Sequence, residues 1–466
     1  MTSSSSLAAA RLPGRAAILG FARSGRALAG ALLDRGVEVT IGDSAPETSF
    51  ENVAPLRARG ARFFFGGPGP DFLDRADWLA ISPGVPLTAA PVRAAKERRM
   101  PVLAEFEVAW RVAENEVRGG SNRWVAVTGT NGKSTTTAWI ADMLRRAERP
   151  VALAGNIGVP LSAFLSETTP RDFVCELSSF QLDAVEDFSA DVAVLTNVTP
   201  DHLDRYDSFE QYAAAKERVF AGQGERDAAV VNADDPVAAR ARTAERVKRV
   251  PFSRRGPVSG GAWVEGNALV SAVAGSTREV LPLRALALPG AHNVENALAA
   301  LCAAGSLGAP DEAIRESLEE FPGLPHRMEL ILERGGIRWV NDSKGTNVDA
   351  TKKSLEGYPE GSVILILGGR DKHGDFSALA PFVARVARRV LTIGEAASVI
   401  EPYLKSSAEV ERRETMDRAV ARAAEIARPG DTVLLSPACA SFDQYRNFEE
   451  RGAHFARLVR EMAHGA

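Results

Sequence analysis

The chain has 466 residues, 45% hydrophobic and 25% charged, and its 56 basic and 60 acidic residues give a net charge of −4. These globular values exclude intrinsic disorder, collagen and coiled coil for the whole chain, and they predict no general attraction to nucleic acid or anionic membranes. The length predicts about three domains. The three cysteines (Cys175, Cys302 and Cys439) form no CxxC pair, so we expect a reducing cytoplasm and neither a disulfide framework nor a zinc site. The opening residues lack a basic signal-peptide region, and no apolar run approaches the roughly 20 residues of a membrane helix.

The first third, residues 1–118, opens with a predicted strand over 15–19, the turn Gly20-Phe-Ala-Arg-Ser-Gly25 and an Ala/Leu-rich helix. A second strand over 37–41 leads to Asp43, and further strands are expected over 79–82 and 101–103. This βαβ opening is typical of nucleotide-binding domains. Ala22 replaces the middle glycine of the dinucleotide fingerprint, which favours a nucleotide-diphosphate site over an NAD site. The alternative is a glycine pair that only packs the helix. The polar segment 114–122 is a predicted linker.

Strands and helices also alternate through residues 119–323 and 324–466. In the middle third we expect strands over 124–128, 173–176, 192–196 and 228–232, an antiparallel patch over 248–288, and an Ala-rich helix over 290–308. A second linker is predicted over 319–325. In the last third we expect strands over 339–341, 363–367, 390–393 and 432–436. The alternation predicts three α/β domains with mostly parallel sheets.

The clearest chemical motif is Val125-Ala-Val-Thr-Gly-Thr-Asn-Gly-Lys-Ser-Thr135, which runs from a strand through a glycine loop into a helix. In such a loop, backbone amides hold phosphate oxygens, Lys133 neutralises their charge, and the hydroxyl of Ser134 or Thr135 faces Mg²⁺. Val127 occupies the first glycine position of the general pattern, so the match is partial.

Polar residues follow two further strands of the middle third. Glu176 ends one strand, where a carboxylate beside a phosphate loop suits Mg²⁺. His202 and Asp204 lie just beyond the next strand. Taken singly, each residue has a bland alternative as an exposed acid or a structural histidine.

In the last third, polar segments follow three strands: 341–347, 368–372 and 436–441. Ligands bind at the carboxyl ends of open parallel sheets. The Lys, Thr, Ser and Arg residues of these segments therefore predict a pocket for an anionic small molecule.

The motifs together resemble the Mur ligases of peptidoglycan synthesis, in order and over essentially the whole chain after about Gly14. They are Gly129-Thr-Asn-Gly-Lys-Ser-Thr135, Glu176-Leu-Ser-Ser-Phe-Gln181, Asn197-Val-Thr-Pro-Asp-His-Leu-Asp204, His292-Asn-x-x-Asn296, Pro325-His-Arg327 and Asn341-Asp-Ser-Lys-Gly-Thr-Asn347. The stretch 435–449 is most similar to the family member that adds D-glutamate.

The resemblance implies a Rossmann-like N-terminal domain, a central P-loop ATPase-type domain and a Rossmann-like C-terminal domain. It implies that ATP phosphorylates the carboxylate of UDP-N-acetylmuramoyl-L-alanine, and that the amine of D-glutamate attacks the acyl phosphate. It further implies two Mg²⁺ ions, a lysine carbamate formed with CO₂, a monomeric cytoplasmic enzyme, and no nucleic-acid or membrane partner.

Site residues carried over from the family fall into four groups. The ATP group is Gly129, Thr130, Asn131, Gly132, Lys133, Ser134, Thr135, Asn293, His326, Arg327 and Asp342, with Asp342 on the ribose. The metal and catalytic group is Lys133, Ser134, Glu176, His202 and Lys216. The UDP-substrate group is Ala22, Arg23, Ser24, Asp43, Ser82, Gly84, Val85, Asn156 and His202. The D-glutamate group is Lys344, Thr346, Lys372, Ser441, Phe442 and Phe448. Sequence alone makes Lys216 a solvated helix lysine; only the resemblance identifies it as the carbamylated one.

Four alternatives remain open. A sister Mur ligase shares the ATP motifs, but one that adds a diamino acid requires an acid in the C-terminal pocket, and none stands out in the sequence. A folylpolyglutamate synthase lacks a UDP-binding first domain. A nicotinamide oxidoreductase and a non-catalytic nucleotide-binding scaffold are disfavoured by Ala22 and by the set Lys133, Glu176, His202 and Lys216, respectively. We also expect the two linkers to allow closure of the third domain on ATP and D-glutamate.

Overall fold

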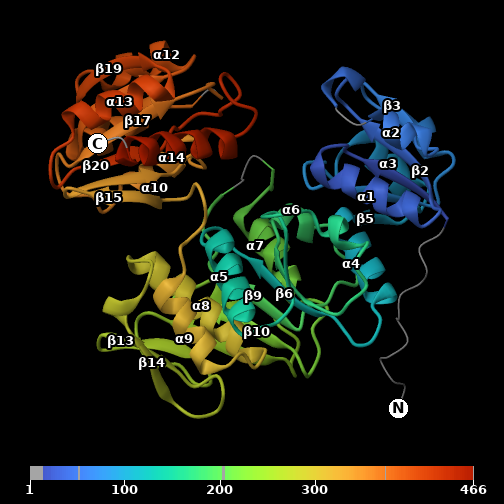
Figure 1. The fold of residues 1–466 in the computed structure, drawn as a ribbon. Helices are drawn as coiled ribbons and strands as arrows, with labels where there is room; N and C mark the ends of the chain where they lie inside the picture. Colours follow the sequence, from blue (N-terminus) through green and yellow to red (C-terminus); the bar gives the residue numbers. More distant parts are fainter. Residues whose placement is uncertain (1–13, 51–52, 202–204, 373, 465–466) are drawn as a thin grey trace. The chain divides into compact units, whose positions relative to one another are not determined.

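The computed structural model describes residues 14–50, 53–201, 205–372 and 374–464, and it contains three mostly parallel sheets with helices on both faces (Figure 1). Internal contacts divide the chain into two units. The first, Met1–Phe321, holds two of the sheets, and the second, Pro322–Ala466, holds the third. The predicted α/β class is confirmed.

The N-terminal sheet is wholly parallel, with strand order β3-β2-β1-β4-β5. Its residues alternate between two cores: Ala16 and Ile18 pack on one face, Ala17 and Leu19 on the other. The strands are β1 (Arg15–Leu19), β2 (Glu38–Asp43), β3 (Arg62–Phe65), β4 (Trp78–Ile81) and β5 (Val102–Ala104). The helices are α1 (Arg23–Asp34), η1 (Glu47–Ser49), α2 (Val53–Ala58), η2 (Pro70–Leu73), α3 (Ala90–Glu97) and α4 (Glu105–Glu116).

The last of these helices, α4, connects the N-terminal sheet to the next sheet. Val108 packs in a core of the N-terminal sheet, whereas Phe106, Ala109 and Val112 pack in a core of the central sheet. The helix also runs into the predicted linker 114–122, so the expectation that the linker begins at Glu114 is wrong. The apolar residues of α4 fill both cores, which explains why the helix persists.

The central sheet has nine strands in the order β14-β13-β12-β11-β10-β9-β6-β8-β7. Helices α5, α8 and α9 pack together along it (Figure 1). The strands are β6 (Arg123–Thr128), β7 (Val151–Gly155), β8 (Asp172–Glu176), β9 (Val192–Leu195), β10 (Ala228–Asn232), β11 (Lys248–Ser253), β12 (Ala262–Glu265), β13 (Ala268–Ser271) and β14 (Arg278–Pro282). The helices are α5 (Lys133–Arg146), η3 (Leu161–Phe164), α6 (Ser179–Leu182), α7 (Phe209–Glu217), η4 (Arg218–Phe220), η5 (Ala238–Arg240), η6 (Leu283–Ala285), α8 (Ala291–Ser306) and α9 (Asp311–Glu320).

The predicted antiparallel patch is confirmed only in part. Strands β12, β13 and β14 form an antiparallel meander, but β11 and β12 continue the parallel order of the sheet. The second predicted linker begins later than expected, because α9 extends to Glu320. Buried Ile314 and Leu318 hold the end of that helix.

The sheet of the second unit has the order β15-β16-β20-β17-β18-β19, and only the β15–β16 pair is antiparallel. The strands are β15 (Glu329–Arg334), β16 (Ile337–Asn341), β17 (Val363–Gly368), β18 (Ala387–Ile393), β19 (Glu409–Glu414) and β20 (Thr432–Leu435). The helices are α10 (Val348–Leu355), η7 (Phe376–Leu379), α11 (Ala380–Val386), α12 (Ala397–Leu404), α13 (Met416–Ile426) and α14 (Phe448–His464). The polar segments after β16, β17 and β20 therefore meet at one edge of this sheet.

Candidate active site

The glycine loop between β6 and α5 is held in a conformation that only glycine fits well. Gly129 and Gly132 have φ values of 148° and 80°. A Cβ on Gly129 would lie 2.0 Å from the Thr196 hydroxyl, and one on Gly132 would lie 2.2 Å from the Asn296 side-chain oxygen. The N-cap residue of α5 is Gly132, which has no side chain to cap the helix. Its first amides are therefore directed at the loop, which is the construction that binds phosphate.

Loop residues 129–135 are anchored by the segment after β9 and by their own lysine. The amides of Thr130 and Asn131 each donate to Asn197 at 2.9 Å. The Lys133 ammonium donates to the carbonyls of Gly129 and Thr130, both at 2.9 Å. Lys133 thus lies over the loop, with its charge beside the amides. Ser134 and Thr135 are buried in the first turn of α5.

Glu176 ends β8 and is 2% exposed. Its Oε1 accepts a hydrogen bond of 2.9 Å from the Asn156 side chain, while its Oε2 is buried without a hydrogen-bond partner among the described residues. A buried carboxylate oxygen without a partner is costly. The donor set therefore fits a divalent cation, for which carboxylate oxygens are preferred ligands.

Lys216 on α7 is 2% exposed rather than solvated. Its ammonium donates to the Gly129 carbonyl at 2.7 Å and lies 4.6 Å from the centre of the Tyr212 ring. Burial, and next the charge of Lys133, lower the pKa of Lys216 to about 7. The structure therefore places this distant residue against the phosphate loop, as a lysine that is partly uncharged at neutral pH.

The remaining predicted residues of the middle third are those after β9 and the adenine contact on α8. His202 and Asp204 lie outside the described residues. Asn293 lies in the first turn of α8, where its side chain donates to the Pro289 carbonyl and accepts from Asn296 at 3.3 Å. Because Asn296 also faces Gly132, the adenine contact predicted for Asn293 lies next to the glycine loop.

Most residues predicted for the UDP substrate lie at the carboxyl edge of the N-terminal sheet, whereas Asn156 follows β7 of the central sheet and His202 lies outside the described residues. Ala22 precedes α1, Arg23 and Ser24 begin it, and Ser82 and Gly84 follow β4. The Asp43 carboxylate accepts from the amides of Phe21 (2.7 Å) and Ala45 (2.9 Å). The Ser82 hydroxyl donates to the Gly20 carbonyl at 2.9 Å. In this structure Asp43 and Ser82 therefore hold the turn after β1, whose Gly20 has a φ of 97°.

In the second unit, Asp342 follows β16 and is 4% exposed. Its carboxylate accepts from the hydroxyls of Ser354 (2.6 Å) and Ser436 (2.8 Å) and from the Met328 amide (3.3 Å). Burial raises its pKa despite these hydrogen bonds. Asp342 thus ties together the segment before β15 and the segments after β16 and β20, in addition to the ribose contact predicted for it.

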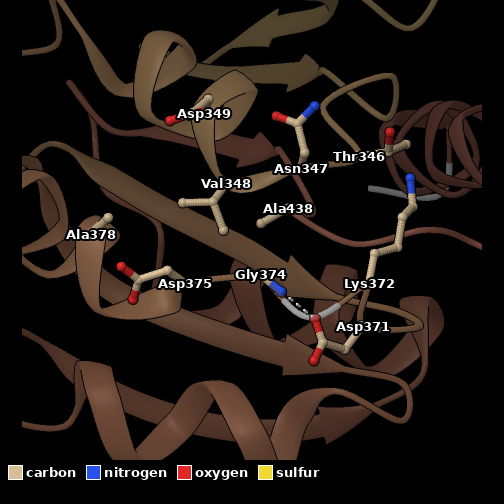
Figure 2. A pocket seen from close by; sticks show the side chains of 10 residues that line it. All are labelled: Thr346, Asn347, Val348, Asp349, Asp371, Lys372, Gly374, Asp375, Ala378 and Ala438. Atoms are coloured by element: carbon tan, nitrogen blue, oxygen red, sulfur yellow. Dashed lines mark hydrogen bonds between the residues drawn. The ribbon is translucent and has the colours of Figure 1, made fainter. Parts of the chain in front are cut away.

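A cavity of about 330 Å³ opens beside the segments after β16 and β17 (Figure 2). The Lys372 ammonium extends toward Thr346, while the Asp371 carboxylate turns the other way and accepts from the Gly374 amide at 2.9 Å. Asp349 and Asp375 also line the cavity. The sequence-based statement that no acid stands out here is therefore wrong: three aspartates surround the cavity.

The other residues predicted for D-glutamate occupy varied settings. Ser441 is 2% exposed, whereas Phe442 is 62% exposed. The Lys344 ammonium lies 6.0 Å from the ring of Phe448, the first residue of α14. The segments that carry these residues are joined by backbone hydrogen bonds, including the Arg370–Ala440 pair at 2.8 and 3.0 Å.

Sequence reasoning missed Arg451, which lies beneath these segments and is 1% exposed. Its guanidinium donates to the Ser343 hydroxyl (3.0 Å) and carbonyl (2.9 Å), to the Gly368 carbonyl (3.4 Å), and twice to the Cys439 carbonyl (3.2 Å). It therefore connects the ends of three strands. A single arginine inside an amphipathic helix gave no signal for this role.

Family models match two regions of the chain. The model described as Mur ligase middle domain matches residues 127–304, and the one described as Mur ligase, glutamate ligase domain matches residues 326–439. Relatives named UDP-N-acetylmuramoylalanine--D-glutamate ligase include that of Acidobacterium capsulatum, 42% identical over 96% of both chains. That of Anaeromyxobacter dehalogenans is 43% identical over 98% of this chain and all of its own. The chain belongs to the Mur ligase family.

Solved structures of other Mur ligases share the fold. The UDP-N-acetylmuramate-alanine ligase of Thermotoga maritima has a TM-score of 0.58 at 20% identity, over 96% of this chain and 99% of its own. MurF of Acinetobacter baumannii has a TM-score of 0.59 at 17% identity, over 95% and 93%. The predicted resemblance to this family is therefore confirmed.

No described helix of this Mur ligase is long and apolar enough to cross a membrane. Nor do its described residues contain a cluster of three or more His, Cys, Asp or Glu side chains arranged to hold a metal.

Proposed function

We propose that this chain is an ATP-dependent ligase that joins D-glutamate to UDP-N-acetylmuramoyl-L-alanine in peptidoglycan precursor synthesis, with release of ADP and phosphate. The observation that carries the proposal is the identity of about 40% over nearly the full chain to ligases of that name. The phosphate loop, Glu176 and Lys216 supply matching chemistry. We place the enzyme in the cytoplasm, where its three buried free thiols stay reduced.

The glycine loop positions ATP for phosphoryl transfer to the substrate carboxylate. Amides of residues 129–135 and the N-terminus of α5 hold the phosphates, and Lys133 neutralises charge that develops between the β- and γ-phosphates. Ser134 and Glu176 would hold Mg²⁺, with His202 at the second ion. When bound, Mg²⁺ supplies further neutralisation of the phosphate charge.

Lys216 is suited to carbamylation because burial and the charge of Lys133 lower its pKa to about 7, which favours the uncharged amine that reacts with CO₂. The amine nitrogen bonds to the carbon of CO₂ and loses a proton, which leaves a carbamate anion in place of a cation. Beside Gly129, this anion would orient the reacting groups and balance the charges of Lys133 and the metal.

The C-terminal unit would bind the amino acid. The cations of Lys344 and Lys372 and the hydroxyls of Thr346 and Ser441 suit the two carboxylates of D-glutamate. Its amine then attacks the acyl phosphate, and the tetrahedral intermediate expels phosphate. The protein contributes mainly alignment of these reactants.

One observation favours a second candidate, a sister ligase that adds a diamino acid. The three aspartates around the cavity beside Thr346 and Lys372 suit a distal ammonium group. Asp371, however, is engaged by the Gly374 amide, and its carboxylate turns away from Lys372 (Figure 2).

The deciding experiment measures phosphate release with Mg·ATP and UDP-N-acetylmuramoyl-L-alanine while amino acids are tested one at a time. We expect release that depends on D-glutamate. Release that depends on a diamino acid would move the chain to the sister activity, and no release with any amino acid would contradict the proposal.

A further inference from the structure

The segment Asn156–Leu165 is fastened at four points to residues on strand β8, in or just after helix α1, and on helix α4. Asn156 bonds to Glu176 through its amide and its side chain, both at 2.9 Å. The carbonyls of Gly158 and Leu165 accept from the guanidiniums of Arg23 and Arg35, respectively. The fourth point is Ser162, in the 3₁₀ helix η3, whose hydroxyl donates to the Glu105 carboxylate.

Glu105 is the first residue of α4 and is 3% exposed. Burial raises its pKa to about 7, opposed only by hydrogen bonds from the side chain and backbone of Ser162. No charged group contributes to that pKa. A carboxylate buried without a cation destabilises a fold unless its hydrogen bonds compensate. Among the described residues, the hydrogen bonds from Ser162 of η3 are what offsets the cost of burying the Glu105 carboxylate.

Glu107, two residues further along α4, shows the contrasting case. Its carboxylate is also buried, but it pairs with Arg111 at 3.0 Å and accepts from the amides of Asp187 and Phe188, both at 3.1 Å. These contacts fasten α4 to the segment before β9 and do not involve η3. Glu107 therefore supports the fold of the same helix and serves as a matched control.

We propose that Glu105 and Ser162 form a positioning pair that fixes the Asn156–Leu165 segment for binding of the UDP-linked substrate. The proposal rests on the function given above, because Arg23 and Asn156 are the residues that the segment places. When η3 is fixed, Arg23 stays at Gly158 and Asn156 stays at Glu176. The pair thereby connects Arg23, predicted to bind the UDP-linked substrate, with Glu176, predicted to hold metal.

The test compares Ser162→Ala and Glu105→Gln with Glu107→Gln. We measure KM for all three substrates, calorimetric binding of UDP-N-acetylmuramoyl-L-alanine without ATP, and Tm. Loss of one hydrogen bond at Ser162 should weaken binding of the UDP-linked substrate about three- to tenfold. KM for ATP and D-glutamate should stay unchanged. Glu107→Gln should lower Tm without changing that binding.

The pH dependence of binding gives a readout that a purely structural role would not move. The ionised carboxylate accepts both hydrogen bonds from Ser162, so affinity of the wild-type protein should rise from pH 6 to pH 8. Lys216 also titrates near pH 7, and its contribution persists in Glu105→Gln. The part of the pH dependence of affinity that disappears in Glu105→Gln is therefore due to titration of Glu105.

Three results would overturn the inference. One is equal binding of the UDP-linked substrate by wild type, Ser162→Ala and Glu105→Gln at every pH. Another is an equal rise of all three KM values together with a fall in Tm, because the pair would then be structural only. The third is additive effects in the double variant, since partners in one hydrogen bond are not additive. If wild type itself failed to bind the UDP-linked substrate, the proposed function would fail with it, a distinguishable outcome.

Discussion

The glycine loop of the first unit, where we propose that ATP binds, and the proposed amino-acid pocket of the second unit have similar places in their sheets but different construction. Both lie at the carboxyl ends of parallel strands. The glycine loop is one run of residues, 129–135, whose backbone amides are proposed to make most of the contacts with phosphate. The pocket takes side chains from three segments that are far apart in the sequence and are joined by Asp342 and Arg451 beneath them.

This difference determines what each site depends on. A backbone loop requires glycine geometry at Gly129 and Gly132, so one methyl group damages it. A pocket made of side chains from separate segments requires buried polar connections, so the loss of a connector misplaces several contacts together. The glycine loop nevertheless contacts one residue distant in sequence, Lys216. Substituting Lys216 therefore tests whether residues 129–135 are sufficient for activity without it.

The largest effect is expected from Lys216→Ala. Loss of the proposed carbamate should lower kcat by about 10²- to 10³-fold, because the positioned charge that we assign to it is removed. A short carboxylate such as acetate should restore part of the activity. Lys216→Arg keeps the positive charge but cannot be carbamylated, so it should be equally inactive. Full activity in either variant, measured by phosphate release, would refute the carbamate role and show that the loop is sufficient.

The next effect tests the loop itself. Gly132→Ala introduces a Cβ that would meet the Asn296 side chain at 2.2 Å and places alanine at a φ of 80°. A displacement of about 1 Å in the loop should cost roughly 100-fold in kcat/KM for ATP. Gly30→Ala is the control, since its Cβ meets nothing within 4 Å and it lies in helix α1. Unchanged ATP kinetics in Gly132→Ala would mean that the loop tolerates movement.

For the second site, the connector to remove is Arg451. Arg451→Met should raise KM for D-glutamate about tenfold and lower stability by about 3 kcal/mol, because the carbonyls of Ser343 and Cys439 lose their donor. Arg388→Met is the control, since Arg388 is partly buried and pairs with Asp431 at the amino ends of β18 and β20, away from the strand ends that Arg451 connects. That control should lose stability and keep its KM. If both variants showed the same rise in KM for D-glutamate and the same loss of stability, Arg451 would only stabilise the fold and would not position the pocket.

The smallest effect concerns the stability contributed by Glu105. Its pKa is raised from 4.5 to about 7 in the folded protein, so its contribution to stability is greatest below pH 4.5 and is lost as pH rises through 7. Glu105→Gln should therefore be more stable than wild type at pH 8, by up to about 3 kcal/mol, and not at pH 5. Urea unfolding at both pH values checks the sign. An equal difference at the two pH values would contradict a buried, titrating carboxyl.

The sequence predicts some parts of the two sites and not others, and the reasons are physical. The glycine loop was readable because strand, loop and helix are consecutive and each has its own local pattern. The carboxyl-edge segments after β16, β17 and β20 were readable as polar runs after apolar strands. Strands β3, β7, β15 and β19, each at an edge of its sheet, were missed, because segments as short as these show no clear period. Arg451, Glu105 and the burial of Lys216 depend on neighbours distant in sequence, which no local pattern reveals.

Helix α4 has a consequence for the way the protein unfolds. Since Val108 belongs to one core of the N-terminal sheet and Phe106 and Val112 to a core of the central sheet, neither of these two cores is complete without this helix. The first two sheets should therefore melt in a single cooperative transition, and the residues from Pro322 onward in a separate one. A fragment that ends at Phe321 should be a stable protein, whereas a cut at residue 118 should leave the piece from residue 119 without a wall of its core. The three sheets would then unfold as two cooperative units, the first two sheets together and the third by itself.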